Sequence, residues 1–343
     1  MRLADRFRYR AGMDESRPLP VLSETDLALV SALQVAPRAP WSAIGRAVGV
    51  DPVTAARRWT RLQEERLAWF VVRPSAEQLA PDRDAVLLKL NCRPGTQVRV
   101  AERFAAVREA YAVDLLAGVD DICVILIGRG LGGMRALVDS LVGRDEDITG
   151  FCVFFVSEVH REDAQWRLGM LSSEQRQELL PSKAGRATAP APEVVDEIAE
   201  VLLEDPRMSL ADLGRRMNLS EPTARRLLDR VLRSRAIRLG CDVVASAGGA
   251  ARGVLLEVSV DDPHAAGRAI SELPAVLRCA AVVGPANLAV MARFVALDEL
   301  ASFEAAAAAM APGWTVTNRS TVARSVKRQG HVLDDEGRLV HPA

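Results

Sequence analysis

The chain repeats one pattern of residues at a constant separation of 169 positions. Four residues of the first half, Arg38, Gly45, Thr54 and Arg57, recur in the second half as Arg207, Gly214, Thr223 and Arg226. Solenoid and propeller repeats have periods of about 20 to 50 residues, so this spacing indicates duplication of a whole module. The chain is therefore expected to contain two copies of one unit.

Each copy of the repeated segment has the pattern of a helix-turn-helix. In the first copy, Ser23 and Asp26 can cap a helix over 22–35, and a second helix is expected over Trp41–Val48. A third helix begins at Asp51 as N-cap, with Pro52 in its first turn. The second copy is expected to repeat this arrangement.

The third helix of each copy separates an apolar face from a face of threonine and arginine. We predict that the polar faces contact DNA, through Thr54, Arg57, Arg58 and Arg61 in the first copy and Thr223, Arg225, Arg226 and Arg230 in the second. Seven arginines oppose three acidic residues over 38–73, and nine oppose three over 207–238, which gives local charges of +4 and +6. The whole chain has a net charge of −1, so basic surface is concentrated on the repeated modules. The alternative is a plain three-helix bundle with solvated arginines.

Strand patterns follow each helix-turn-helix. Connecting strands are expected over 67–73 and 237–245. A β-α-β-β-α-β order then occurs twice, ending in strands over 149–158 and 314–324. We predict an α+β fold in which two winged-helix-like helix-turn-helix domains alternate with two ferredoxin-like βαββαβ domains, each sheet covered by the sheet of the other copy.

The expected boundaries follow from these elements. They are an arm over 1–18, a first helix-turn-helix domain over 19–66, a first strand-and-ferredoxin-like domain over 67–160, a connector over 161–191, a second helix-turn-helix domain over 192–236, a second strand-and-ferredoxin-like domain over 237–327, and a tail over 328–343.

This order of elements resembles the Lrp/AsnC (feast/famine) family of transcription regulators. The sequence motifs that carry the resemblance are Val48-Gly49-Val50-Asp51-Pro52 before Thr54 and Leu219-Ser220 before Thr223. The resemblance implies a two-unit regulator that binds double-stranded DNA, self-associates and responds to an amino acid or related metabolite. It also implies a ligand site in the loop between the second and third strands. The residues at that place are Gly118, Asp120 and Asp121 in the first copy and Gly284 and Asn287 in the second.

Catalytic patterns are scarce. The four histidines do not have metal-ligand spacing in the sequence, so no metal, no cofactor and no enzymatic activity are predicted. Two alternatives remain: an enzyme resembling the sirohaem decarboxylases, which share the regulator fold, and an architectural DNA-binding protein without a ligand. A Gly-x-Gly-x-x-Gly pattern over 128–133 lacks the acidic residue that a dinucleotide site needs.

The five cysteines are scattered and odd in number, which favours reduced thiols and a cytoplasmic location. The longest apolar runs are too short to span a bilayer.

Overall fold

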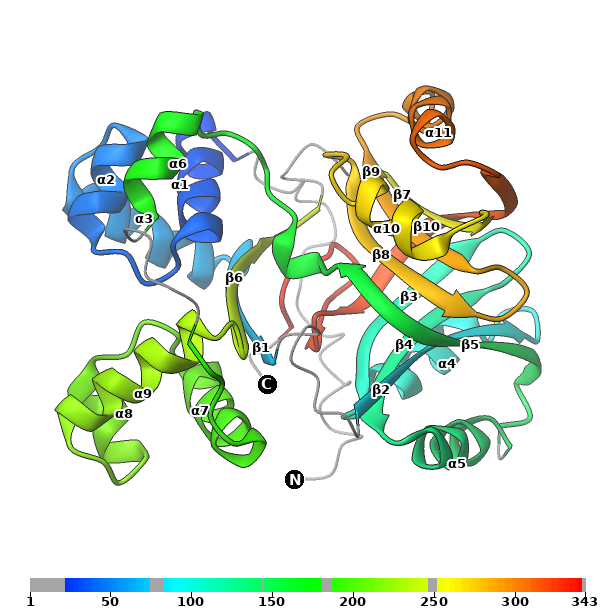
Figure 1. The fold of residues 1–343 in the computed structure, drawn as a ribbon, viewed down its shortest axis with the longest axis horizontal. Coiled ribbons are helices and arrows are strands. Elements are labelled where there is room, and N and C mark those ends of the chain that lie inside the picture. The colour runs from blue at the N-terminus through cyan, green and yellow to red at the C-terminus, as the bar shows by residue number, and fades with distance from the viewer. Residues whose placement is uncertain (1–21, 75–82, 144, 181–186, 246–251, 341–343) are drawn as a thin grey trace.

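The computed structural model describes residues 22–74, 83–143, 145–180, 187–245 and 252–340. Two three-helix modules lie side by side, and a β-barrel with helices on its outside lies next to them (Figure 1). A two-stranded ribbon runs between the modules and the barrel. The predicted N-terminal arm and part of the connector lie outside the described residues.

The first module contains α1 (Glu24–Val35), α2 (Trp41–Val48) and α3 (Pro52–Glu64). Its helix starts are those that the sequence predicts. Ser23 and Asp26 form a reciprocal capping box, and the Asp51 side chain accepts a hydrogen bond from the backbone N–H of Val53. The short helix α6 (Ser173–Leu179) packs against α1 and α2, and its Leu179 joins their apolar core.

The second module contains α7 (Pro192–Glu204), α8 (Leu210–Arg216) and α9 (Glu221–Arg233). Ser209 caps α8 through the N–H of Asp212. The apolar face of α9 consists of Ala224, Leu228 and Val231, all buried. The helix therefore divides into the two faces that its spacing predicts.

The ribbon joins the modules. Strands β1 (Ala68–Pro74) and β6 (Ile237–Val243) pair antiparallel, with Ala68 opposite Val243. β1 follows directly after α3, and β6 follows directly after α9. Each strand also packs against the first helix of the other module, β1 against α7 and β6 against α1. The two modules are thus interlocked.

Two β-α-β-β-α-β segments form the remainder. The first comprises β2 (Arg83–Cys92), α4 (Gln97–Ala105), β3 (Ala110–Ala117), β4 (Ile122–Arg129), α5 (Leu131–Val142) and β5 (Ile148–Arg161). The second comprises β7 (Arg252–Ser259), α10 (Pro263–Ile270), β8 (Val276–Val283), β9 (Leu288–Phe294), α11 (Glu299–Met310) and β10 (Thr315–Arg328), and the short β11 (His331–Val332) follows.

The two predicted sheets do not pack face to face. Instead, their edges pair and one eight-stranded ring closes in the order β10-β3-β4-β2-β5-β8-β9-β7, with β7 returning to β10. The expectation of two separate sheet layers was wrong on this point. The reason is strand length: β5 and β10 each have 14 residues, more than predicted. The first part of β5 pairs with β2 and its end pairs with β8, whereas β10 pairs first with β7 and then with β3. Closure leaves these strands without exposed edges.

The barrel separates three apolar cores. Helices α4 and α5 cover one outer face, and α10 and α11 cover the other. The interior holds a third cluster that includes Leu87, Phe154, Leu255 and Met291. None of the described helices is both long and apolar enough to cross a membrane.

A charged cluster is buried inside the barrel. The Nζ of Lys89 lies 2.7 Å from Asp120 Oδ2 and 2.7 Å from Glu257 Oε1, and Asn318 donates a hydrogen bond to Glu257. Lys89 and Glu257 occupy the same position in their respective halves, the fourth residue after Ala85 and after Gly253.

Candidate nucleic-acid interface and ligand cavity

The outward face of α3 is only partly available to a ligand. Arg57 is exposed and makes no hydrogen bond or ion pair with any of the described residues, and Thr54 is half-buried beside it. Val53, in the first turn, is 75% exposed. A half-buried threonine beside an exposed arginine and an exposed aliphatic group at the start of a helix can contact base edges and a thymine methyl group.

Arg58 and Arg61 lie on the same helix but are already paired. Arg58 Nη1 lies 3.0 Å and Arg61 Nη2 2.9 Å from the two carboxylate oxygens of Asp26 on α1. Burial raises the pKa of Asp26, but hydrogen bonds from Ser23 and Arg58 outweigh it and leave the pKa below its usual value. These two arginines therefore fasten α3 to α1, and a DNA contact from them would have to use their remaining N–H groups.

On α9 the four predicted residues are in different states. Arg225 and Arg226 are exposed, with Arg225 lying 3.3 Å from Glu221 and Arg226 donating to the hydroxyl of Thr223 at 3.3 Å. Arg230 donates from Nε to the carbonyl of Thr188 at 2.9 Å. Arg225 and Arg226 thus remain accessible at the surface, whereas Arg230 helps hold the segment before α7.

The two modules are joined by a reciprocal pair of arginines. Arg38 donates to the carbonyls of Pro206 and Met208, and Arg207 donates to the carbonyls of Pro37 and Ala39. The guanidinium of Arg207 also lies over the Trp41 ring, 4.3 Å from its centroid. Burial lowers the pKa of both arginines. We call these two residues the arginine clamp; each grips the loop between the first two helices of the other module.

The predicted effector loop of the first half makes contacts within the chain. Asp120 is buried against Lys89. Asp121 accepts a hydrogen bond from the N–H of Cys92 at 2.7 Å. Gly118 leaves room for Ser320, because a Cβ at this position would lie 2.5 Å from the Ser320 hydroxyl oxygen.

The second half has the same arrangement with different chemistry. The Asn287 amide accepts from the N–H of Val260 at 3.0 Å and donates to its carbonyl at 2.8 Å. A Cβ on Gly284 would lie 2.5 Å from the Phe154 ring. In both halves these loop residues brace the strand ends, and their role in effector binding stays a prediction.

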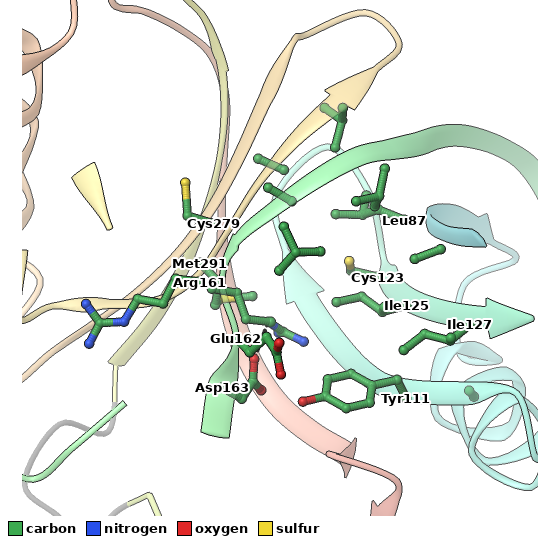
Figure 2. A pocket seen from close by; sticks show the side chains of 18 of the residues that line it. Leu87, Tyr111, Cys123, Ile125, Ile127, Arg161, Glu162, Asp163, Cys279 and Met291 are labelled. Atoms are coloured by element: carbon green, nitrogen blue, oxygen red, sulfur yellow. Dashed lines mark ion pairs between the residues drawn. The ribbon is translucent and has the colours of Figure 1, made fainter. Parts of the chain in front are cut away.

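A cavity of about 260 Å³ opens elsewhere, at the end of the barrel that faces the ribbon. Figure 2 shows Tyr111, Glu162 and Asp163 gathered at one end of it, with Leu87, Ile125 and Ile127 along its wall, while Arg161 points away. The lining also includes Arg73 from β1 and Arg278 and Met291 from the second half. The cavity is thus an apolar chamber with a charged end.

The charged end contains polar atoms that lack partners among the described residues. Asp163 has a fully buried side chain, and Arg278 Nε lies 3.2 Å from its Oδ1, but neither carboxylate oxygen has a hydrogen bond of good geometry. Arg278 Nη1 also lacks a partner. Burial raises the pKa of Asp163. Burial also lowers the pKa of Arg278, but the nearby carboxylates of Asp163 and Asp114 outweigh this effect, so the pKa of Arg278 lies above its usual value. Burial also keeps Tyr111 a neutral phenol by raising its pKa.

Few features of the sequence predict this cavity. Tyr111 shares its otherwise apolar strand with Asp114, Arg278 is the one polar residue of its strand, and Asp163 lies in the segment interpreted as a connector. In the glycine pattern over 128–133, Gly128 has a packing role, because a Cβ there would lie 2.6 Å from the Met134 sulfur. The one sequence signal for a polar barrel interior is the occurrence of polar residues at alternate positions along otherwise apolar strands.

Comparison with known proteins supports two different relationships. Residues 22–63 match the AsnC-type helix-turn-helix domain, a DNA-binding module. No curated protein matches the chain. Over 89% of its length the chain is similar to the siroheme decarboxylase NirDL, solved in co-complex with an iron-uroporphyrin III analogue, with 13% identity, a TM-score of 0.55 and 93% of that chain covered. The same enzyme in another structure gives a TM-score of 0.54 at 14% identity. Escherichia coli AsnC, at 13% identity and a TM-score of 0.36, covers 40% of this chain and 94% of its own.

The prediction that the chain is not an enzyme was wrong. It relied on the scarcity of catalytic motifs, yet the fold that matches the chain almost from end to end is that of an enzyme. Sparse motifs did not exclude an active site, because a cavity with buried ionisable groups such as Asp163 and Arg278 can be assembled from single residues far apart in the sequence.

Proposed function

We propose that the chain is a sequence-specific DNA-binding transcription regulator controlled by a small metabolite. The observation that carries the proposal is the AsnC-type helix-turn-helix at residues 22–63, whose third helix presents Arg57 at the surface without a hydrogen bond or ion pair to the described residues. In this proposal α3 and α9 enter the major groove of one DNA face about 10 bp apart. The two helices differ in sequence, so the operator need not be palindromic.

The outward side chains of α3 and α9 divide into those proposed to contact DNA and those that hold the helices in place. Thr54 and Arg57 on α3, with Arg225 and Arg226 on α9, are the residues proposed to meet base edges or nearby phosphates. Arg58 and Arg61 act mainly through Asp26, since they keep α3 in place. The arginine clamp holds the two modules together, which favours a fixed spacing between the two reading helices.

We place the metabolite in the barrel cavity because its polar groups suit a zwitterion. A carboxylate can accept from Arg278 Nη1 and the Tyr111 hydroxyl, while an ammonium group can donate to Asp163. The apolar wall of Leu87, Ile125 and Met291 would receive a side chain. At 260 Å³ the cavity lies just below the ~300–1,000 Å³ of pockets for drug-sized ligands, so an apolar amino acid is the proposed class.

The cavity also touches the ribbon that carries both reading helices. Arg73, on β1, lines it, and Glu162 lies 3.7 Å from Arg238 on β6. A ligand that moves these groups acts on the strands that leave α3 and α9. This route gives a physical link from effector to DNA affinity.

The DNA proposal is tested by selecting genomic fragments with the purified chain at physiological salt and footprinting the selected sites. Arg57→Ala and Arg226→Ala should each weaken binding by ~1–3 kcal/mol if they read bases. Arg135→Ala, on α5, removes the same charge far from the modules and is the matched control. Unchanged affinity in both variants would rule out these reading residues. Binding without sequence preference would instead support an architectural protein.

The effector proposal is tested separately, by calorimetry with the set of apolar amino acids and no DNA. We expect one of them to bind, and Asp163→Asn to abolish binding while the α5 control Asp139→Asn keeps it. Absence of amino-acid binding would overturn the effector assignment and leave DNA binding untouched.

A second candidate function is an enzyme acting on a tetrapyrrole, favoured by the fold that the chain shares with siroheme decarboxylase over most of its length. The cavity is small for a ring system of that size. Tight binding of an iron porphyrin carboxylate, with loss of carbon dioxide from it, together with no selection of DNA fragments, would favour this candidate over the regulator.

A further inference from the structure

Two of the chain's four histidines meet on the outer side of the barrel although they are 104 positions apart. His160 lies near the end of β5 and His264 in the first turn of α10, and both face Glu158 of β5. These are the only three metal-ligating side chains among the described residues whose donor atoms all lie within 4.8 Å of one another. The site therefore joins a strand of the first half to a helix of the second.

The donor atoms of the three side chains lie close enough together to share one ion. His160 Nδ1 lies 3.5 Å from Glu158 Oε1, and His264 Nδ1 lies 2.6 Å from Oε2. The His264 Nδ1 is buried, yet it has no hydrogen bond of acceptable geometry to any residue that the structure describes. Donor atoms ~2.0–2.1 Å from a tetrahedral Zn²⁺ are roughly 3.3 Å apart, so small side-chain shifts would bring all three into place.

The surroundings hold the histidine rings and leave one side open. The His160 ring is buried over Gly267, where a Cβ would lie 2.0 Å from its Cδ2 and 2.6 Å from its Nε2. Gly267 thus makes the space that the ring occupies. Glu158 and His264 are each nearly half exposed, which provides an entry path and leaves a coordination position for water.

We propose that Glu158, His160 and His264 form a binding site for a divalent first-row transition metal ion, Zn²⁺ in the first instance. Two imidazoles and one carboxylate are a ligand set that these ions accept, and hard Mg²⁺ or Ca²⁺ would prefer oxygen ligands. The bound ion would tie β5 to α10 and so brace the two halves of the barrel against each other. This proposal does not depend on the proposed regulatory function.

The test is calorimetric titration of the full chain, first stripped with a chelator, with Zn²⁺ alone. We expect one equivalent to bind, and His264→Ala and Glu158→Gln each to weaken it at least tenfold. Both side chains are half exposed, so these variants should fold, and circular dichroism verifies that they do. Glu272→Gln, which removes an exposed carboxylate just after α10, should bind as the parent chain does.

A thermal readout addresses the bracing role. At a Zn²⁺ concentration near the Kd of the parent, the Tm of the parent and of Glu272→Gln should rise, and the Tm of the two ligand variants should rise much less. Absence of stoichiometric Zn²⁺ binding to the parent chain would overturn the site. Binding that both ligand variants retain would also overturn it, because the ion would then be bound elsewhere, for example by a cysteine.

Discussion

Replacement of Lys89 by methionine tests whether the barrel interior depends on its charged cluster. The ammonium group contacts Asp120 and Glu257, and all three side chains are at most 8% exposed. Burial lowers the pKa of Lys89, but the hydrogen bonds and charges of the two carboxylates outweigh it and raise the pKa above its usual value. The group is therefore cationic wherever the chain is folded. Methionine keeps the length and the apolar stem but removes the charge.

The expected cost follows from what the substitution leaves behind. Removing one partner of a buried ion pair typically costs ~3–5 kcal/mol, a large part of the ~5–15 kcal/mol that stabilises a native domain. In Lys89→Met, two neighbouring carboxylates remain without a counter-ion, and one must take up a proton to stay buried. Protons are scarcer at high pH, so the loss should be larger at pH 8 than at pH 5.5.

Hydrogen exchange of the β2 and β7 amides is the appropriate assay, because it reports opening of the barrel even if the helical modules unfold separately. Arg135→Met removes an exposed cation on α5 and should change the opening free energy by less than about 0.5 kcal/mol. A loss below about 1 kcal/mol in Lys89→Met at pH 8, or an equal loss at both pH values, would refute the reasoning.

Three further predictions concern the modules and the barrel. Asp26→Asn should destabilise the first module by about 2 kcal/mol at neutral pH, because two charged hydrogen bonds to Arg58 and Arg61 are weakened; chemical unfolding that shows no change contradicts this. Burial and the nearby Arg73 lower the pKa of His331 to about 4, whereas in the unfolded chain it protonates near 6.5, so stability should fall by about 3 kcal/mol as the pH drops through that window. His331→Gln should remove this acid loss, and unfolding curves at pH 4 and 7.5 measure it. Gly284→Ala should cost ~1–3 kcal/mol, and more than Gly118→Ala, since the first meets the buried Phe154 ring and the second a serine side chain; equal midpoints of thermal unfolding would argue against this packing.

The local elements were predictable because their signals lie within a few residues. The capping box of Ser23 and Asp26 and the start of α3 at Asp51 and Pro52 are set by backbone hydrogen bonds inside one turn. Strand existence followed from apolar patterning in the same way. The predicted division of α3 into a buried and an outward face also holds.

Long-range pairing was not predictable from these signals. The pattern of β5 shows where a strand lies but not that its last residues pair with β8, and that pairing closes the barrel. Likewise, Arg58 appears as a surface cation by helical spacing, whereas its partner Asp26 lies 32 positions earlier. The cavity residues Tyr111, Asp163 and Arg278 meet only after closure.

The asymmetry of the barrel interior bears on how many effector molecules one chain can hold. Lys89 and Glu257 occupy equivalent positions and contact each other, so two identical halves would place like charges side by side inside the barrel. The two halves instead carry opposite charges at this position. The residues that line the cavity also differ between the halves. Tyr111 and Ile127 of the first half correspond to Leu277 and Arg293 of the second by the pairing of their strands.

The equivalent opening in the other half therefore lacks the Tyr111 phenol and the Asp163 carboxylate. Arg278 and Met291 line both openings, but the second one also contains Arg293, Arg324 and the tail residues Leu333 and Glu336. A zwitterion with an apolar side chain would find its complementary groups once per chain, not twice. Calorimetry with the amino acid that binds should give a stoichiometry of one, and a value of two would mean that the second opening, despite its arginines, accepts the same ligand.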